Sequence, residues 1–217
     1  MQSAKNAIIL AAGMGSRLGM NQPKCLVEVH NKKIIDYQLE LLRNFNDVRI
    51  VVGFKEEEVI DYVSKIRKDV VFVRNSQYNT TSNIFSAALA TKHLAQPFFL
   101  LDGDVIINKN DFARFVKKCT ESQDNIVGIT KAKTEEPVFV EVKNGYVSRF
   151  STNYTTAYEW CGLAYFYNLK IEDSYQGYIY KILEKNLPIK AYRLEVYEID
   201  TPYDYALAIK MLKDELY

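Results

Sequence analysis

A loop near the start of the chain carries the residues best suited to chemistry. A short apolar stretch runs into Gly13 and Gly15, and two cations, Arg17 and Lys24, follow. Small residues let backbone N–H groups approach an anion closely. Arginine offers a planar fork for phosphate oxygens, and lysine offers a compact charge. The loop therefore predicts a site that binds a polyphosphate.

Other interpretations of this loop remain. A structural strand-to-helix turn accounts for the two glycines equally well. A Rossmann dinucleotide site requires G-x-G-x-x-G, but Leu18 occupies the position of the third glycine. The next expected strand, over residues 48–54, also ends without an acidic residue to hold a ribose. A Walker P-loop requires G-K-[ST], which the loop lacks.

Two carboxylates follow a second apolar stretch. Asp102 and Asp104 come directly after residues 98–101, which are typical of a strand, so we expect them at the carboxyl end of a sheet. Magnesium prefers one or two carboxylates together with phosphate oxygens and water, and Asp200 is a candidate partner for Asp104. Asp200 also precedes a helix start at Pro202, so a capping role explains it equally well.

These segments together resemble the nucleotidyltransferase family, which contains the sugar-phosphate nucleotidyltransferases and the small cytidylyltransferases. The string L-A-A-G-M-G-S-R-L-G at 10–19, with the following P-K, carries the resemblance. Segments 100–104, 160–164 and 197–202 are similar to the family's acidic strand end, its glycine-bearing strand beside the acceptor and its late aspartate segment. The likeness covers most of the chain and is greatest to the branch of the CTP:phosphocholine cytidylyltransferases.

The resemblance implies a magnesium-dependent transfer of a nucleoside monophosphate to a phosphorylated acceptor, with release of pyrophosphate. It implies catalytic roles for Lys24, Arg17 and Asp104. It places Mg²⁺ at Asp104 and Asp200. The residues that it implies for nucleotide binding are Leu10, Ala11, Ala12, Gly13, Met14, Gly15, Ser16, Arg17, Lys24, Asn79, Ser82 and Asp102.

The choice of nucleotide depends on the turn before an expected helix. Sugar-phosphate members more often show a Gln-x₄-Gly pattern there, whereas this chain has Gln77 and Ser82 in those places. Asn79, Asn83 and Ser86 resemble the asparagine-rich turn and serine-bearing helix of the phosphocholine cytidylyltransferase branch. This departure favours CTP over dTTP or UTP. Ser82, at the start of a helix, is equally well explained as its cap.

The acceptor side is expected to be aromatic. Trp160 lies between Glu159 and Gly162, and these three are the expected acceptor-binding residues. An indole face attracts an ammonium group by a cation–π interaction. We therefore expect a small phosphorylated or phosphonate acceptor with a cationic nitrogen, such as a phosphocholine-like compound, aminoethylphosphonate or a phospho-amino acid. A buried strand also explains the aromatic residues.

Two other functions remain open. A sugar-1-phosphate nucleotidyltransferase that makes an NDP-sugar shares the same loop. A nucleotide-binding regulator could be built on the same fold without catalysis.

The composition excludes several classes of protein. The chain has 28 basic and 27 acidic residues, so its net charge creates no electrostatic field that would attract nucleic acid or a membrane surface. Its apolar runs have the length of strands, so membrane insertion is not expected. The three cysteines, Cys25, Cys119 and Cys161, are far apart, and residues 1–6 lack a signal peptide's apolar region. Both observations predict that the protein is located in the reducing cytoplasm. A homo-oligomer is compatible with this composition.

Strands and helices alternate through much of the chain. Strands are expected over residues 7–11, 49–52, 70–73, 98–101 and 126–130, and helices over 34–45, 56–67, 83–95 and 111–120. Later come a hairpin at 138–142 and 146–150, a strand at 162–167, and helices at 171–184 and 202–216. This order predicts an α/β, Rossmann-like doubly wound, mostly parallel sheet with helices on both faces and a small antiparallel β extension in the second half. We expect a single domain over 1–217, with a nucleotide-binding part at about 1–131 and an acceptor-side part at about 132–217.

Overall fold

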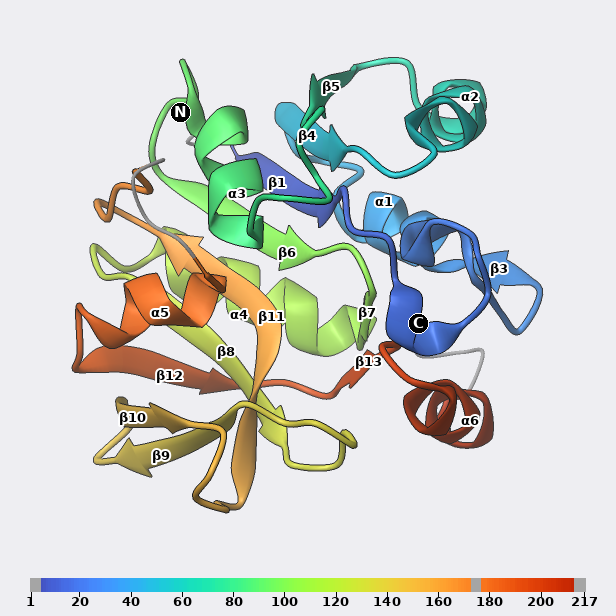
Figure 1. The fold of residues 1–217 in the computed structure, drawn as a ribbon. Coiled ribbons are helices and arrows are strands. Elements are labelled where there is room, and N and C mark those ends of the chain that lie inside the picture. The colour runs from blue at the N-terminus through green and yellow to red at the C-terminus, as the bar shows by residue number, and fades with distance from the viewer. Residues whose placement is uncertain (1–4, 173–176, 213–217) are drawn as a thin grey trace.

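The computed structural model describes residues 5–172 and 177–212, and a nine-stranded sheet forms its centre (Figure 1). The strands lie in the order β5-β4-β1-β6-β11-β8-β12-β10-β9. Their bounds are β1 Asn6–Ala11, β4 Asp47–Val52, β5 Val70–Arg74, β6 Phe98–Asp102, β8 Ile126–Lys131, β9 Phe139–Lys143, β10 Tyr146–Ser151, β11 Tyr158–Phe166 and β12 Ile189–Arg193. Two short ladders stand apart, β2 Glu28–Val29 with β3 Lys32–Lys33 and β7 Val105–Ile107 with β13 Val196–Glu198.

The first four strands of this order are parallel. β1 pairs with β4 on one side and with β6 on the other, and β5 continues beyond β4. The chain thus runs outward from β1 to β5 and then returns to the other side of β1. In open α/β sheets such a reversal leaves a crevice at the carboxyl ends of the strands.

The rest of the sheet is mixed, which corrects the expectation of a mostly parallel sheet with a small antiparallel extension. β11 lies between β6 and β8 and is antiparallel to both, whereas β8 and β12 are parallel. The strand expected at 162–167 is the end of this longer element, which is buried throughout residues 159–166. The expected hairpin of β9 and β10 is confirmed, with positive φ angles at Asn144 and Gly145.

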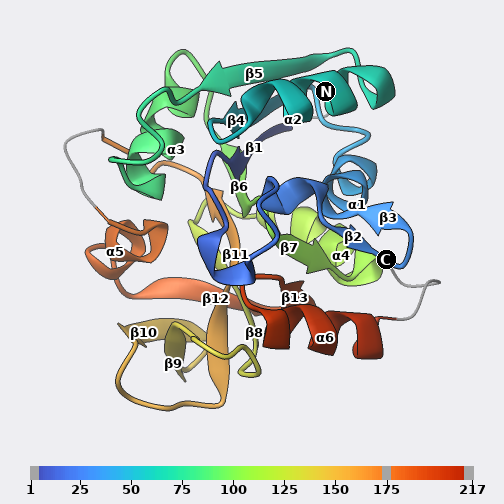
Figure 2. The same cartoon turned by 45° about the vertical axis from the view of Figure 1, so that its right-hand side comes forward.

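Helices cover both faces of the sheet (Figure 2). The helices are α1 Ile34–Leu41, α2 Glu56–Ile66, α3 Asn83–Thr91, α4 Lys109–Thr120, α5 Ile179–Glu184 and α6 Pro202–Met211. α1, α2 and α4 pack with Ile9 in one core, and α3 and α5 pack with Ile8 in the other. Because successive strand residues point to opposite faces, β1 fills both cores, which explains its continuous apolar run.

Several helices are shorter than the sequence predicts. α1 ends at Leu41 and α3 at Thr91, and α5 holds only the last residues of the helix expected over 171–184. Residues 173–176 of that segment, and residues 213–217 of the last expected helix, lie outside the described residues. None of the helices in the described ranges combines the length and the apolar character needed to cross a bilayer.

Candidate active site

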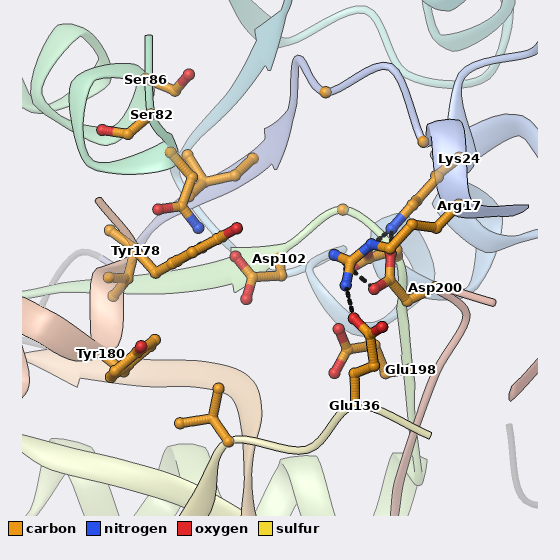
Figure 3. Close-up of a pocket in the computed structure, with 18 of the residues that line it drawn as sticks. Arg17, Lys24, Ser82, Ser86, Asp102, Glu136, Tyr178, Tyr180, Glu198 and Asp200 are labelled. Carbon is orange, nitrogen blue, oxygen red and sulfur yellow. Dashed lines mark hydrogen bonds and ion pairs between the residues drawn. The ribbon is translucent and has the colours of Figure 1, made fainter. Parts of the chain in front are cut away.

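A cavity of about 870 Å³ opens where the strand order reverses, beyond the carboxyl ends of β1 and β6 (Figure 3). One wall is the loop after β1, with the short 3-10 helices η1 (Ser16–Leu18) and η2 (Lys24–Leu26). The opposite wall comes from segment 135–139 and from the start of α5. Residues from the beginning and the end of the chain thus meet in one cavity.

In the loop after β1, the Lys24 side chain packs closely over Gly15. Gly15 has a φ of 59° and Gly19 a φ of 72°, in the left-handed region that favours glycine. A Cβ on Gly15 would lie 2.5 Å from Lys24 Cγ, so any other residue would displace the lysine. Leu18 is buried and anchors η1, while the neighbouring Arg17 side chain is half exposed. The loop therefore fixes its backbone and presents two cations to the cavity.

These two cations contact carboxylates from other elements (Figure 3). Lys24 Nζ donates to Asp104 at 2.8 Å and also to Asp200. Arg17 pairs with Asp200 at 2.6 Å and with Glu136 at 2.6 Å. Burial alone would lower the pKa of Lys24, but the Asp104 and Asp200 carboxylates outweigh it and raise that pKa above its usual value. Lys24 is therefore charged at neutral pH.

Two further carboxylates line the cavity beside this network. Burial, together with the negative charge of Asp104, raises the pKa of Asp102 to about 8, while the positive charge of Lys24 and a side-chain hydrogen bond from Trp160 oppose the shift. Burial and Asp104 also raise the pKa of Glu198 well above its usual value. A Cβ on Gly162 would lie 3.0 Å from the Asp102 side chain, so glycine lets β11 approach this carboxylate closely. This excess of partly buried carboxyl groups suits a site that receives a cation.

The structure brings most of the predicted site residues together. Those that line the cavity are Leu10, Ala11, Ala12, Gly13, Gly15, Ser16, Arg17, Lys24, Ser82, Asp102, Asp104, Trp160 and Asp200. Met14, Asn79, Glu159 and Gly162 are not part of its lining. Met14 and Asn79 are exposed at the surface, and Gly162 packs behind Asp102.

Glu159 and Trp160 point to opposite faces of β11. Side chains alternate along a strand, and Trp160 lines the cavity, so Glu159 turns into the core on the other face. There its Oε2 accepts a hydrogen bond from Thr134 Oγ1 at 2.8 Å, and burial raises its pKa. Asp102 and Glu198, which come from other strands, are instead among the carboxylates that share the cavity with the indole.

Tyr178, Tyr180 and Glu198 are among the cavity-lining residues that sequence reasoning missed. Tyr178 and Tyr180 stack with their ring centroids 6.0 Å apart and an interplanar angle of 11°, in the same cavity as Trp160. No local pattern separates these two tyrosines from the others in the chain. Glu198 did leave a signal, because it lies two residues before Asp200 in an extended segment, where alternation puts both on one side.

The turn before α3 lies at the end of the cavity opposite Lys24, on the same side as Tyr178 (Figure 3). Ser82 Oγ and Asn83 Oδ1 are buried, and within the described residues neither has a hydrogen-bond partner. Ser82 makes no side-chain cap to α3, so that interpretation is wrong. Asp200 does not cap α6 either, because Thr201 and Asp204 form the capping box there. Helix capping therefore does not explain why Ser82 and Asp200 line the cavity.

The carboxylates of Asp104 and Asp200 converge on one point, where they meet the Lys24 ammonium group. Across the described part of the chain, no three His, Cys, Asp or Glu side chains are arranged to hold a metal. Magnesium takes one or two carboxylates where substrate phosphates and water supply its other ligands. The two carboxylates therefore fit a magnesium ion that binds with a nucleotide, and not a cage made by protein alone.

Known proteins with similar sequences include cytidylyltransferases. The chain is 36% identical over 141 residues to the CTP:phosphoglutamine cytidylyltransferase of Campylobacter jejuni, covering 63% of this chain and 52% of that protein. It is 39% identical over 119 residues to a choline-phosphate cytidylyltransferase of Streptococcus pneumoniae, covering 52% of this chain and 51% of that protein. The chain thus spans about half the length of the curated relatives it matches.

A solved structure agrees over nearly the whole chain. The CTP:phosphocholine cytidylyltransferase of Streptococcus pneumoniae superposes with a TM-score of 0.80 at 26% identity, covering 97% of this chain and 100% of that one. This confirms the α/β, Rossmann-like architecture. Residues 7–154 match the family described as the MobA-like NTP transferase domain, which is more than half of the 217 residues. The resemblance noted in the sequence is therefore confirmed, and the chain belongs to the MobA-like NTP transferase domain family.

Proposed function

We propose that this chain is a magnesium-dependent cytidylyltransferase, which transfers CMP from CTP to a small phosphorylated or phosphonate acceptor with a cationic nitrogen. The observation that carries the proposal is a single cavity with paired cations and carboxylates at one end and aromatic rings at the other. The similarity to cytidylyltransferases that act on phosphoglutamine and choline phosphate supports it.

The chemistry requires charge neutralisation more than proton transfer. The second pKa of a phosphate monoester is about 6, so the attacking oxygen is already charged near neutral pH. This oxygen forms a bond to the α-phosphorus of CTP while the bond to pyrophosphate breaks and its electron pair leaves with pyrophosphate. Lys24 and Arg17 would bind the phosphates, hold the two anions in line and offset the charge that develops.

Magnesium would be held by Asp104 and Asp200, whose carboxylates converge on one point. A bound magnesium ion would supply further positive charge at the phosphate oxygens. For the ion to bind there, the Lys24 ammonium must move from between the carboxylates toward the triphosphate. Lys24 thus serves as the counter-ion of both carboxylates before CTP arrives.

The aromatic end supports an acceptor with a cationic nitrogen. Tyr178, Tyr180 and Trp160 line this end, and aromatic faces attract ammonium groups. The nearby carboxyl groups of Asp102 and Glu198 have raised pKa values, and a cation bound beside them would favour their charged forms. CTP is favoured as the nucleotide because Ser82 at the far end replaces the glycine of the sugar-phosphate pattern.

A pyrophosphate-release assay tests the proposal. The four nucleoside triphosphates are combined with phosphocholine, 2-aminoethylphosphonate, a phospho-amino acid and glucose 1-phosphate, each with Mg²⁺ and with EDTA. The expected result is release from CTP with an acceptor that carries a cationic nitrogen, and no release with EDTA. Preference for glucose 1-phosphate would assign the chain to the sugar-phosphate branch, and CTP binding without any turnover would favour a regulator.

A further inference from the structure

The ion pair between Arg17 and Glu136 joins the two walls of the cavity (Figure 3). Arg17 comes from η1, after β1, and Glu136 comes from the segment between β8 and β9. Both side chains are largely open to solvent, with 50% and 62% exposed. The pair therefore lies at the mouth of the cavity, next to Lys24 and Asp200.

The backbone on each side of this pair is held in place. On one side, the buried Leu18 anchors η1. On the other side, the Glu135 N–H donates to Asp204 Oδ1 at 3.1 Å, and the Val138 carbonyl accepts from the backbone of β11 at 2.8 Å. The Glu136 side chain can therefore change its partner without movement of the wall that carries it.

Glu136 is the weaker of the two carboxylate partners of Arg17. The Asp200 side chain is only 8% exposed and also binds Lys24, whereas Glu136 is in contact with water. Exposed ion pairs contribute little because water and salt screen them. A phosphate group offers arginine two parallel charge-assisted hydrogen bonds. An incoming triphosphate therefore replaces Glu136 before it replaces Asp200.

We propose that Glu136 is an exchangeable partner of Arg17 and couples the two substrate sites, an inference that rests on the function proposed above. When the triphosphate takes Arg17, the Glu136 carboxylate is released into the cavity, on a wall segment whose Val138 carbonyl accepts from the Trp160 N–H. There it pairs with the cationic nitrogen of the acceptor. The nucleotide thus prepares the acceptor site, and the acceptor binds second.

Glu136→Gln tests the exchange, because glutamine keeps the size of the side chain and removes its charge. CTP binding, measured by calorimetry with Mg²⁺ and no acceptor, should tighten about two- to fivefold, the effect of removing one exposed ion pair. The KM for phosphocholine should rise about two- to fivefold, and kcat should stay within about twofold. A purely structural role would not move the two substrates in opposite directions.

The coupling itself is measured on the full chain with a non-hydrolysable CTP analogue. Phosphocholine should bind more tightly when the analogue is present, and Glu136→Gln should lose this gain. Glu136→Asp, which keeps the charge on a shorter side chain, should restore part of it. Glu141→Gln is the matched control, because it removes a carboxylate from an exposed ion pair with Lys143, 3.0 Å long and outside the cavity. It should change neither affinity.

Weaker CTP binding by Glu136→Gln would overturn the inference. So would a phosphocholine affinity that is the same with and without the analogue. Failure of the proposed function is a different result, since no acceptor would then support pyrophosphate release. The CTP-binding measurement needs no turnover and tests the exchange at Arg17 in either case.

Discussion

At the phosphate end of the cavity, charged side chains hold one another: Lys24 and Arg17 share Asp200. At the acceptor end, Tyr178 and Tyr180 present stacked rings. Paired charges must change partners before a substrate can bind, whereas an aromatic surface is ready to bind as it stands. From this difference we expect substitutions at the phosphate end to lower kcat, and substitutions at the acceptor end to change which acceptor is preferred.

The strongest test of this contrast is Lys24→Ala. If the Lys24 ammonium offsets charge in the transition state, kcat should fall about 10²–10³-fold, as when one preorganised donor is removed. The Kd for CTP should change far less, because Arg17 and the loop backbone remain. Lys143→Ala, at a surface lysine, is the control. A variant with near wild-type kcat would remove Lys24 from the catalytic residues.

Asp104→Asn and Asp200→Asn examine the metal at the same end. Each should lower magnesium-dependent turnover by about 100-fold or more, because metal ions supply several kcal/mol of charge stabilisation. The thermal midpoint should change little for Asp200→Asn, since Thr201 and not Asp200 caps α6. Asp124→Asn, at an exposed pair with Lys190, is the matched control. Activity that survives in Asp200→Asn would leave this carboxylate with a structural role only.

Tyr178→Ala tests how much the aromatic end of the cavity contributes to acceptor binding. The side chain is 60% exposed, so its removal should leave the fold intact. A cation–π contact is worth about 0.5–2 kcal/mol, so the KM for a cationic acceptor should rise roughly two- to thirtyfold while the KM for CTP stays constant. Tyr154→Ala removes another exposed tyrosine, outside the cavity, and should have no such effect. An equal rise for glucose 1-phosphate would contradict the cationic acceptor.

The smallest effect is expected from alkylation of Cys25, which lines the phosphate end but is buried. Burial raises the pKa of this thiol to about 12, from an ordinary 9.0, so iodoacetamide at pH 8 should leave activity unchanged. In urea the same thiol should react. Because the folded pKa is the higher one, this thiol should lower the free energy of unfolding as pH rises from about 9 to 12. Inactivation that CTP prevents would show a reactive thiol instead.

The sequence was most informative where structure is local. The apolar run of β1, the glycine turns after it and the strand end at Asp102 lie in continuous segments, and the predicted elements there are close to those observed. The two carboxylates expected to lie together, Asp104 and Asp200, do so in the structure. Asp104 lies where expected, just after the carboxyl end of β6, whereas Asp200 reaches it through the short antiparallel ladder of β7 and β13.

Predictions failed where pairing depends on segments far apart in the chain. The central place of β11 and its antiparallel direction follow from contacts with β6 and β8, which no local pattern encodes. Glu159 and Trp160 are neighbours in sequence, and strand alternation separates them. Tyr178 and Tyr180 reach the cavity only because α5 packs against it.

The position of β11 also bears on how this protein could acquire new acceptors under the function proposed above. Since β11 carries Trp160 and is hydrogen-bonded to β6, the strand that ends at Asp102, the aromatic and the acidic side chains of the cavity are anchored to one continuous sheet. The acceptor wall therefore cannot be exchanged as a module without rupture of the nucleotide wall. New specificity must arise by replacement of single side chains along segment 135–139 and at the start of α5, which makes these positions the natural targets for directed evolution.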